Sequence, residues 1–290
     1  GPKQGQTLEE VKDLLLEQID VLRKGEWDES LLAAGIANYK LRQQNTLEDN
    51  ESRADMFVQA FVNGMDWADM VDRVERMEKI TKADVVAFGN EYLKDTNYAV
   101  VYKRQGVDTN EKKIAKPAIT PIMTNRDTTS EFLRDIQATE VTPIEPVFVD
   151  FNQDMGYGEI GQLPMLYKKN EMNDIFTLQY VFDFGTNEVK SLGIARDYMD
   201  YLGTSDMTAA EIKQAFYNLA CNYSISTGTR KTTISVSGLS ENMREAASLL
   251  EKVITDAQPN EEAYKNLVAD ILKSRNDNKA NQATNFSRLR

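Results

Sequence analysis

The sequence of 290 residues contains no histidine and a single cysteine, Cys221. Histidine is the commonest general base and the commonest protein ligand of catalytic zinc. Its absence therefore excludes Ser-His-Asp and Cys-His catalysis and all ordinary catalytic zinc sites. One cysteine excludes an internal disulfide and a thiolate metal cluster. A carboxylate-only acid/base mechanism and a hard-cation site made of oxygen ligands stay open.

Positive charge and long apolar runs are also scarce. The chain has 34 Lys and Arg against 46 Asp and Glu, for a net charge of −12. Phosphate binding needs a basic surface, so we expect no nucleic-acid partner. No stretch approaches the roughly 20 apolar residues of a membrane span, so we expect none. The 41% hydrophobic and 28% charged residues are typical of a soluble globular protein.

The first segment, residues 1–103, is predicted to be mostly helical. Capping boxes at Thr7–Glu10 and Thr81–Asp84 predict helix starts. Apolar residues at helical spacing predict helices over about 8–22, 28–41, 54–64, 70–77 and 81–92. The run at 98–102 predicts one buried strand. We expect an apolar stripe at helical spacing to be core rather than a ligand groove. It comprises Met56, Phe57, Phe61, Met65, Trp67 and Met70.

The amino-acid composition of the chain changes at about residue 104 and again at about residue 147. Prolines and threonines punctuate residues 104–146, which we interpret as a linker with one helix at 130–138. In the segment 147–290 we expect strands at 147–151, 163–169, 175–184, 222–228 and 231–238, the last two as a hairpin. Helices are expected at 190–202, 209–219 and around Met243–Ile254 and Tyr264–Leu272. This order predicts an α+β fold, with helices packed on a mainly antiparallel sheet.

Two glycine motifs suggest nucleotide chemistry. Gly156, Gly158 and Gly161 match G-x-G-x-x-G, and Asp183–Gly185 matches the kinase D-F-G. A dinucleotide-binding loop must open a helix, but an extended run follows here. A kinase also needs a histidine-containing catalytic loop and a long helical lobe before D-F-G. We therefore interpret the glycines as a flexible loop before a strand, and D-F-G as a turn after one.

Three carboxylates and the cysteine are further candidates. Asp197 and Asp200 are i, i+3 neighbours on a predicted helix, and Glu211 lies nearby. They could form a carboxylate pair, but we interpret them as solvated helix surface and a helix N-terminal cap. No base is available to activate Cys221, so we expect a buried, inert thiol.

The second half resembles a known family of repeats. Residues 161–170 resemble the first strand of an insulinase/pitrilysin repeat, and residues 176–185 resemble its second strand and turn. Gly203-Thr204, the helix start at 208–211 and the hairpin ending at 236–239 continue the resemblance. Residues 6–93 are similar to the C-terminal half of the preceding repeat. The chain thus resembles the interior of an insulinase/pitrilysin-type zinc metallopeptidase, which implies a LuxS/insulinase-like α+β fold.

The family places an inverted zinc motif, H-x-x-E-H, shortly before Gly-Thr. Counting back from Gly203-Thr204, the two His positions hold Ile194 and Tyr198, and the Glu position holds Asp197. In the family motif the His residues bind zinc and the Glu activates water. Ile194 has no donor atom, so we expect this helix face to be packing surface. The resemblance implies no catalytic residue, no metal ligand and no cofactor here, with zinc in an upstream N-terminal domain of the parent protein.

We therefore expect three parts. Residues 1–103 would be the C-terminal part of an inactive repeat, 104–146 a linker between halves, and 147–290 a degenerate repeat in an interior fragment. The implied function is a non-catalytic segment of a zinc metalloendopeptidase, forming part of a peptide-enclosing chamber.

The implied partners are the remaining parent domains and a peptide substrate, in a bacterial periplasm or cell envelope. The alternative is a non-proteolytic structural or peptide-binding subunit, like the core proteins of respiratory complexes or the partner of a separate catalytic chain.

Overall fold

The computed structural model describes residues 2, 5–104, 106–107, 114–122, 124 and 128–289. These form two compact units. The first combines Gly1–Tyr98 with Asn170–Arg290, and the second is Ala99–Lys169. The boundaries at 103 and 146 stay predictions of the sequence.

The N-terminal part of the first unit is helical. Both predicted capping boxes are present, because Thr7 and Thr81 each accept a backbone hydrogen bond from the third helical residue while its carboxylate accepts one in return. The predicted helix at 70–77 is instead two short helices. The elements are α1 Leu8–Lys24, α2 Ser30–Glu48, α3 Asn50–Val62, α4 Trp67–Val71, α5 Arg73–Met77 and α6 Lys82–Tyr92.

The C-terminal part of the first unit is built on an antiparallel sheet. Its strands are β3 Ile175–Phe182, β4 Cys221–Thr227 and β5 Thr232–Leu239, in the order β3-β5-β4. The predicted β4–β5 hairpin is therefore confirmed. The helices here are α8 Leu192–Met199, α9 Ala209–Asn218, α10 Met243–Thr255, α11 Glu261–Ala280 and α12 Gln282–Arg288.

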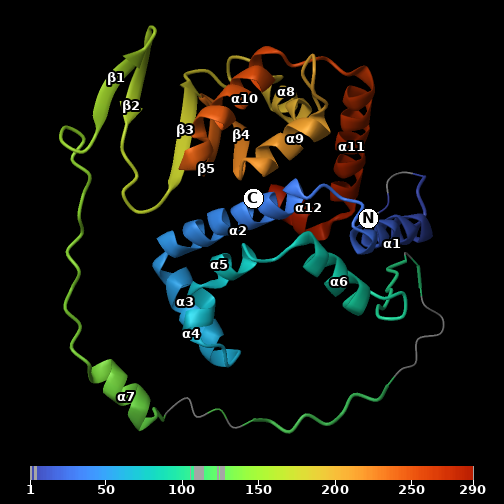
Figure 1. The fold of residues 1–290 in the computed structure, drawn as a ribbon, viewed down its shortest axis with the longest axis vertical. Coiled ribbons are helices and arrows are strands. Elements are labelled where there is room, and N and C mark those ends of the chain that lie inside the picture. Colours follow the sequence, from blue (N-terminus) through green and yellow to red (C-terminus); the bar gives the residue numbers. More distant parts are fainter. Residues whose placement is uncertain are drawn as a thin grey trace. The chain divides into compact units, whose positions relative to one another are not determined.

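One face of the sheet carries the main core. Helices α9 and α10 lie on this face (Figure 1), and their apolar residues interlock with alternate residues of the strands. The buried cluster consists of Phe176, Ile212, Phe216, Cys221, Ile234, Val236, Ala246, Leu250 and Val253. Helices on one face of an antiparallel sheet confirm the predicted α+β class.

Helix α2 joins the two parts of this unit. Its Leu41 is buried with Ile175, Ala220 and Leu239 at the end of the sheet. The side-chain amide of Asn38 also donates to the carbonyl of Tyr217, at 2.7 Å. The helical N-terminal part therefore packs on the same body as the sheet.

Two predicted strands are wrong. Residues 98–102 and 147–151 form no strand, and Val101 and Val147 are 91% and 97% exposed. Both runs have β-forming composition, but neither is paired with another strand in the part of the chain that the structure describes. A strand needs a neighbour to satisfy its backbone groups.

The second unit contains a β-hairpin in the region of the G-x-G-x-x-G motif, where the sequence predicted a loop before a strand. β1 Gly156–Ile160 pairs antiparallel with β2 Leu163–Tyr167, so the interpretation of these glycines as a flexible loop is wrong. Gly161 has a φ of 63° at the first position of the two-residue turn, where hairpins favour glycine. The predicted helix of the linker is confirmed as α7 Glu131–Ala138, capped by Ser130.

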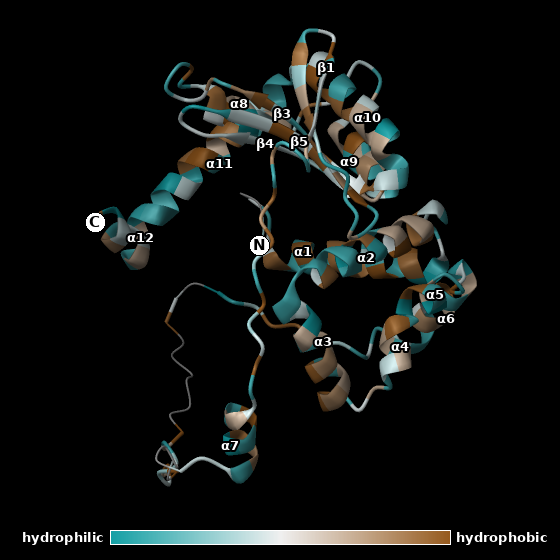
Figure 2. Cartoon of the chain, turned by 90° about the vertical axis from the view of Figure 1, so that its left-hand side faces the viewer, coloured by the Kyte–Doolittle hydropathy of each residue, from teal (hydrophilic) through white to brown (hydrophobic). Residues whose placement is uncertain are grey.

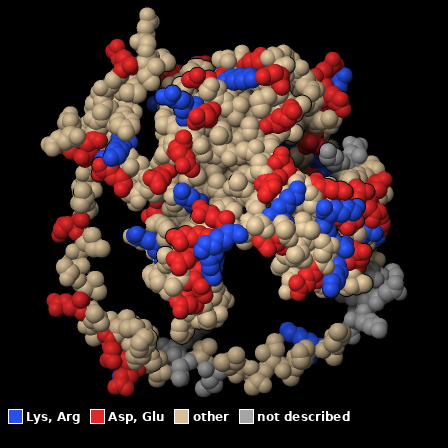
Figure 3. Space-filling model, in the orientation of Figure 1, with Lys and Arg blue, Asp and Glu red and all other residues tan. Residues whose placement is uncertain are grey.

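The apolar stripe of α3 and α4 is not the predicted core. Only Met70 of the six is buried, whereas Phe57 and Phe61 are 57% and 87% exposed. Phe57 stacks on Trp67 with ring centroids 4.1 Å apart, so the two helices cover each other in part. Figure 2 shows hydrophobic residues along α3 and α4. On the face seen in Figure 3, acidic and basic side chains are mixed rather than gathered into a basic patch.

Candidate functional site

Helix α8 carries the three positions of the inverted zinc motif. Ile194 is 45% exposed, so the expectation that it packs is wrong. Asp197 pairs with the neighbouring Arg196. The Tyr198 hydroxyl donates to the carbonyl of Asn260 and accepts from its N–H, both at 2.7 Å.

These three side chains do not fit a catalytic zinc ion. Ile194 has no donor atom, the Asp197 carboxylate faces a guanidinium, and the Tyr198 hydroxyl is engaged by backbone groups. Zinc needs three protein ligands converging on one point. The residues of α8 therefore support no metal-dependent reaction. Tyr198 instead links α8 to Asn260 at the start of α11.

The Gly-Thr pair after α8 is also structural. Thr204 donates its N–H to the carbonyl of Met207 at 2.8 Å and its hydroxyl to Asp206 at 2.9 Å. Lys252 of α10 lies 2.6 Å from the Asp206 carboxylate. The hydrogen bond from Lys252, followed by that from Thr204, lowers the pKa of Asp206 below its usual value. The segment is thereby fastened to α10.

Two of the three candidate carboxylates have partners of their own, Asp197 with Arg196 and Glu211 with Thr208. Glu211 accepts from the backbone N–H and the hydroxyl of Thr208, at 2.7 and 2.8 Å, which confirms it as a helix cap. These hydrogen bonds lower the pKa of Glu211. Among the described residues there is no group of three His, Cys, Asp or Glu side chains placed to hold a metal ion. The absence of catalytic residues stays a prediction.

Cys221 is 1% exposed, which confirms the buried thiol. Its Sγ donates to the carbonyl of Leu219 at 3.3 Å. Burial raises the pKa of Cys221 to about 11, so the thiol is neutral at physiological pH. A neutral thiol is a poor nucleophile.

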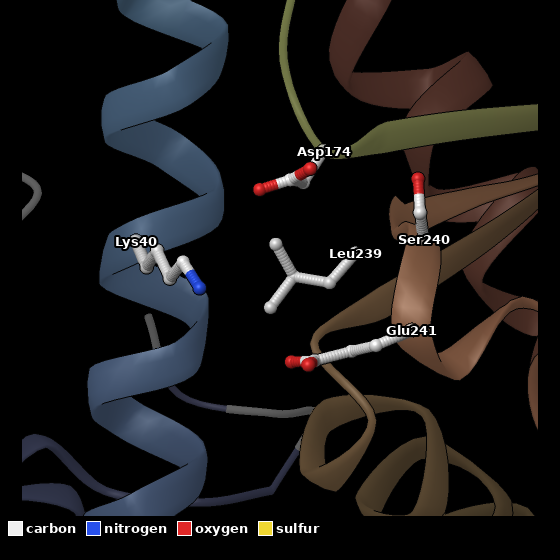
Figure 4. Close-up of a pocket in the computed structure, with 5 residues that line it drawn as sticks. All are labelled: Lys40, Asp174, Leu239, Ser240 and Glu241. Atoms are coloured by element: carbon white, nitrogen blue, oxygen red, sulfur yellow. The ribbon is translucent and has the colours of Figure 1, made fainter. Parts of the chain in front are cut away.

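A small pocket of about 240 Å³ lies between α2 and the end of the sheet. In Figure 4, the side chains of Lys40, Asp174 and Glu241 point into the same space, and Leu239 lies between Asp174 and Glu241. The lining combines both signs of charge with the hydroxyl of Ser240, which points away from Lys40 and Glu241 in Figure 4. We interpret the pocket as a gap in the packing between α2 and the sheet rather than as a reaction site.

The outer edge of β3 is the feature that the sequence did not reveal. The N–H of Ser240 donates to the carbonyl of Asp174 at 2.8 Å, which fixes this as a hydrogen-bonded pair. Hydrogen-bonded and non-bonded pairs alternate along an antiparallel ladder. The backbone groups of Thr177, Gln179 and Val181 therefore point away from β5, on the side of β3 that has no further strand of this sheet.

Away from α2, the sheet face opposite α9 and α10 is uncharged and, apart from Val181, polar. The hydroxyls of Ser224 and Ser235 lie 3.1 Å apart across β4 and β5. Apart from Ile175 and Leu239, which are buried with Leu41 of α2, the strand residues on this face are Thr177, Gln179, Val181, Asn222, Ser224, Ser226, Thr233, Ser235 and Ser237. Such a face can donate and accept hydrogen bonds without selecting for charge.

The fold and this sheet define an α+β protein in which helices cover one face of an antiparallel sheet and the other face is polar. No protein-family model matches the sequence, and no curated protein matches it. Among the described helices, none combines the length and apolar character that a bilayer crossing requires.

Three solved structures are similar to this chain. A peptidase M16 inactive domain from Pseudomonas fluorescens has 17% identity and a TM-score of 0.40, covering 46% of this chain and 34% of that one. A protease from Helicobacter pylori has 12% identity and a TM-score of 0.37, covering 43% and 32%. The periplasmic protease PqqL from Escherichia coli has 12% identity and a TM-score of 0.40, covering 98% and 32%. The chain thus spans about a third of the length of each.

Proposed function

We propose that this chain is a non-catalytic segment of an insulinase/pitrilysin-type zinc metalloendopeptidase, and that it forms part of the wall enclosing a peptide. The main support for this proposal comes from the residues at the zinc-motif positions of α8. At the motif positions it holds Ile194, Asp197 and Tyr198, and the latter two are engaged in protein contacts. Zinc would belong to an upstream domain of the parent, in a bacterial periplasm or cell envelope.

The sheet next to α8 suits a wall that touches peptide. Its uncharged polar face offers hydroxyl and amide groups such as Ser224 and Asn222, while the chain as a whole carries a net charge of −12. A peptide of either charge could lie on such a face without meeting a buried or unpaired charge. The partners of this chain would be the remaining parent domains and the peptide.

The alternative, a non-proteolytic subunit with the same fold, shares the loss of chemistry on α8. The two differ in what the complete gene encodes. A sequence H-x-x-E-H upstream of Gly1 is expected for the peptidase, and its absence would favour the subunit.

The proposed function is tested by asking whether the purified chain binds a peptide without cleaving it. A fluorescein-labelled peptide of about 10 residues, rich in Thr and Val, is long enough to match a typical strand. We expect saturable binding to the chain by fluorescence anisotropy, with the peptide intact by mass spectrometry. A peptide of the same composition plus proline at alternate positions is the control, because it cannot form a strand. Cleavage, or no binding at all, would overturn the proposal.

A further inference from the structure

The end of α3 contains a chemically reactive pair of residues. Asn63-Gly64 is the only Asn-Gly sequence of the chain, and every other asparagine precedes a residue that bears a side chain. The backbone nitrogen that follows an asparagine can attack the asparagine side chain. Glycine hinders this attack least, because it has no Cβ and its backbone is the most permissive. The pair is therefore a candidate for spontaneous deamidation.

The way in which α3 ends requires this glycine. The Met65 N–H donates to the Ala60 carbonyl at 2.9 Å. The Gly64 N–H donates to the Phe61 carbonyl at 3.1 Å, and the two bonds together are the Schellman pattern of helix termination. Gly64 has a φ of 61°, in the left-handed region that favours glycine. The fold thus places a glycine directly after Asn63.

The Asn63 side chain is available for the reaction. Asn63 is exposed, and its carboxamide makes no hydrogen bond within the described part of the chain. By contrast, the Asn38 carboxamide donates to the carbonyls of Ala34 and Tyr217, at 2.8 and 2.7 Å. The two reacting groups at the end of α3 lie in consecutive residues, so the reaction needs no contact with another part of the chain.

We propose that Asn63 is a site of spontaneous deamidation and isoaspartate formation in the folded chain, controlled by opening of the end of α3. The Gly64 nitrogen loses its proton to hydroxide and attacks Cγ of Asn63. The new N–C bond closes a cyclic imide, and the Cγ–Nδ2 bond breaks. The nitrogen that leaves takes a proton from water and becomes ammonia. Water then opens the imide at either carbonyl, which leaves aspartate or isoaspartate and an added negative charge.

The last turn of α3 must open before the reaction can occur. In the closed turn the Gly64 N–H is held by the Phe61 carbonyl and cannot attack. Helix ends open at low free energy, and this end is weakly packed because the side chains of Phe61 and Val62 are exposed. Asn63 should therefore react more slowly than in the unfolded chain, but faster than Asn38 in the folded chain.

Either product would weaken the junction between α3 and α4. A carboxylate at the C-terminus of a helix lies at the negative end of the helix dipole. Isoaspartate also adds a carbon to the main chain, which would separate the Met65 N–H from the Ala60 carbonyl. Hydrogen exchange at Met65 should be faster in the converted chain, and the stacking of Phe57 on Trp67 lies at the same junction.

Peptide mapping by mass spectrometry tests the proposal. The purified chain is incubated in mildly alkaline buffer, either folded or in guanidinium chloride. Isoaspartate is identified with isoaspartyl methyltransferase, which methylates its carboxylate. We expect conversion of Asn63 in both states, with Asn38 intact in the folded chain and no isoaspartate at this position in Asn63→Gln. An unchanged Asn63 in the folded chain, when the unfolded chain is already converted, would overturn the proposal.

Two variants at Val62 test control by the helix end, because this residue takes no part in the ring. Alanine favours a helix and glycine disfavours it, so folded Val62→Gly should deamidate roughly two- to fivefold faster than folded Val62→Ala. In guanidinium chloride the two variants should react at the same rate. Equal rates in the folded state, with both variants folded by circular dichroism, would refute control by the end of α3.

Discussion

At the residue scale, Gly238 shows how tightly the end of β5 is packed. A methyl group on this residue would collide with the carbonyl oxygen of Ala220 and with Cys221, whose Cα would lie 2.7 Å away. We expect Gly238→Ala to lower the free energy of unfolding by about 1–3 kcal/mol, the usual cost of overpacking. Gly193→Ala on α8 is the control, since nothing lies within 4 Å there.

Urea denaturation measures both variants. The Gly193 variant should gain stability, by roughly 0.5–1 kcal/mol, because alanine favours a helix over glycine. Equal midpoints for the Gly238 variant and the native chain would show that the contact between β5 and the start of β4 is loose.

Cys221 gives a chemical readout of the same core. Because burial raises its pKa to about 11, the folded thiol should resist iodoacetamide at pH 8. It should react at the rate of unfolding, and freely in urea. Fast alkylation of the native chain, followed by mass spectrometry, would contradict the buried site.

The shifted pKa of Cys221 also sets a pH dependence. The unfolded thiol ionises near pH 8.5, and the folded one at about 11. Between these values the unfolded state has lost the proton that the folded state keeps, so stability falls as pH rises through this window. Cys221→Ala should remove that part of the slope in urea titrations at successive pH values.

At the scale of elements, Tyr198 is the link between α8 and α11. Its hydroxyl makes two hydrogen bonds with Asn260, and its ring meets Tyr264 edge to face at 5.6 Å. Tyr198→Phe keeps the ring and takes away the acceptor of the Asn260 N–H, whereas the Asn260 carbonyl still accepts from the N–H of Tyr264 at 3.0 Å. We expect a loss of about 1–2 kcal/mol in the free energy of unfolding.

Tyr201→Phe is the matched control for this prediction, since Tyr201 lies just beyond α8 and is 43% exposed. It should change stability by no more than about 0.5 kcal/mol. Hydrogen exchange should also show faster opening of α8 only in the Tyr198 variant. Equal thermal midpoints for both variants would refute the role of Tyr198 as a link.

Elements with local signals were predictable from the sequence. The capping boxes opening at Thr7, Thr81 and Thr208 lie within four residues each, and all three begin helices. The runs at 98–102 and 147–151 failed because β composition supplies no pairing partner. β1 was missed because its glycines favour loops, yet Gly161 permits a tight turn that brings β2 alongside.

The candidate site was predictable only in part. Spacing from Gly203-Thr204 located the three motif positions on α8. The bonds of Tyr198 join residues 62 apart in sequence, which no local pattern reports. The position of β3 at the end of its sheet depends on the strand order β3-β5-β4, and the direction of its backbone groups depends on the register; both arise from tertiary packing.

At the scale of the whole molecule, α3 displays apolar side chains to solvent. Val58, Phe61 and Val62 are 57%, 87% and 72% exposed. Apolar surface of this kind binds hydrophobic dyes and other proteins. We expect an anilinonaphthalene dye to fluoresce with the native chain, and Phe61→Ser to weaken the signal.

Gln59→Ser on the same helix is the control, because it alters an exposed polar residue. Both exposed substitutions should change stability by no more than about 0.5 kcal/mol. A native chain that binds no dye would show that these side chains are covered in solution.

We propose that α8 holds no zinc at its three motif positions. The most direct test is the zinc content of the purified chain after dialysis against Zn²⁺, measured by atomic emission alongside an Asp197→Asn variant. We expect no stoichiometric zinc in either protein, because Ile194, Asp197 and Tyr198 do not form a ligand set. One tightly held zinc per native chain, lost in the variant, would contradict it.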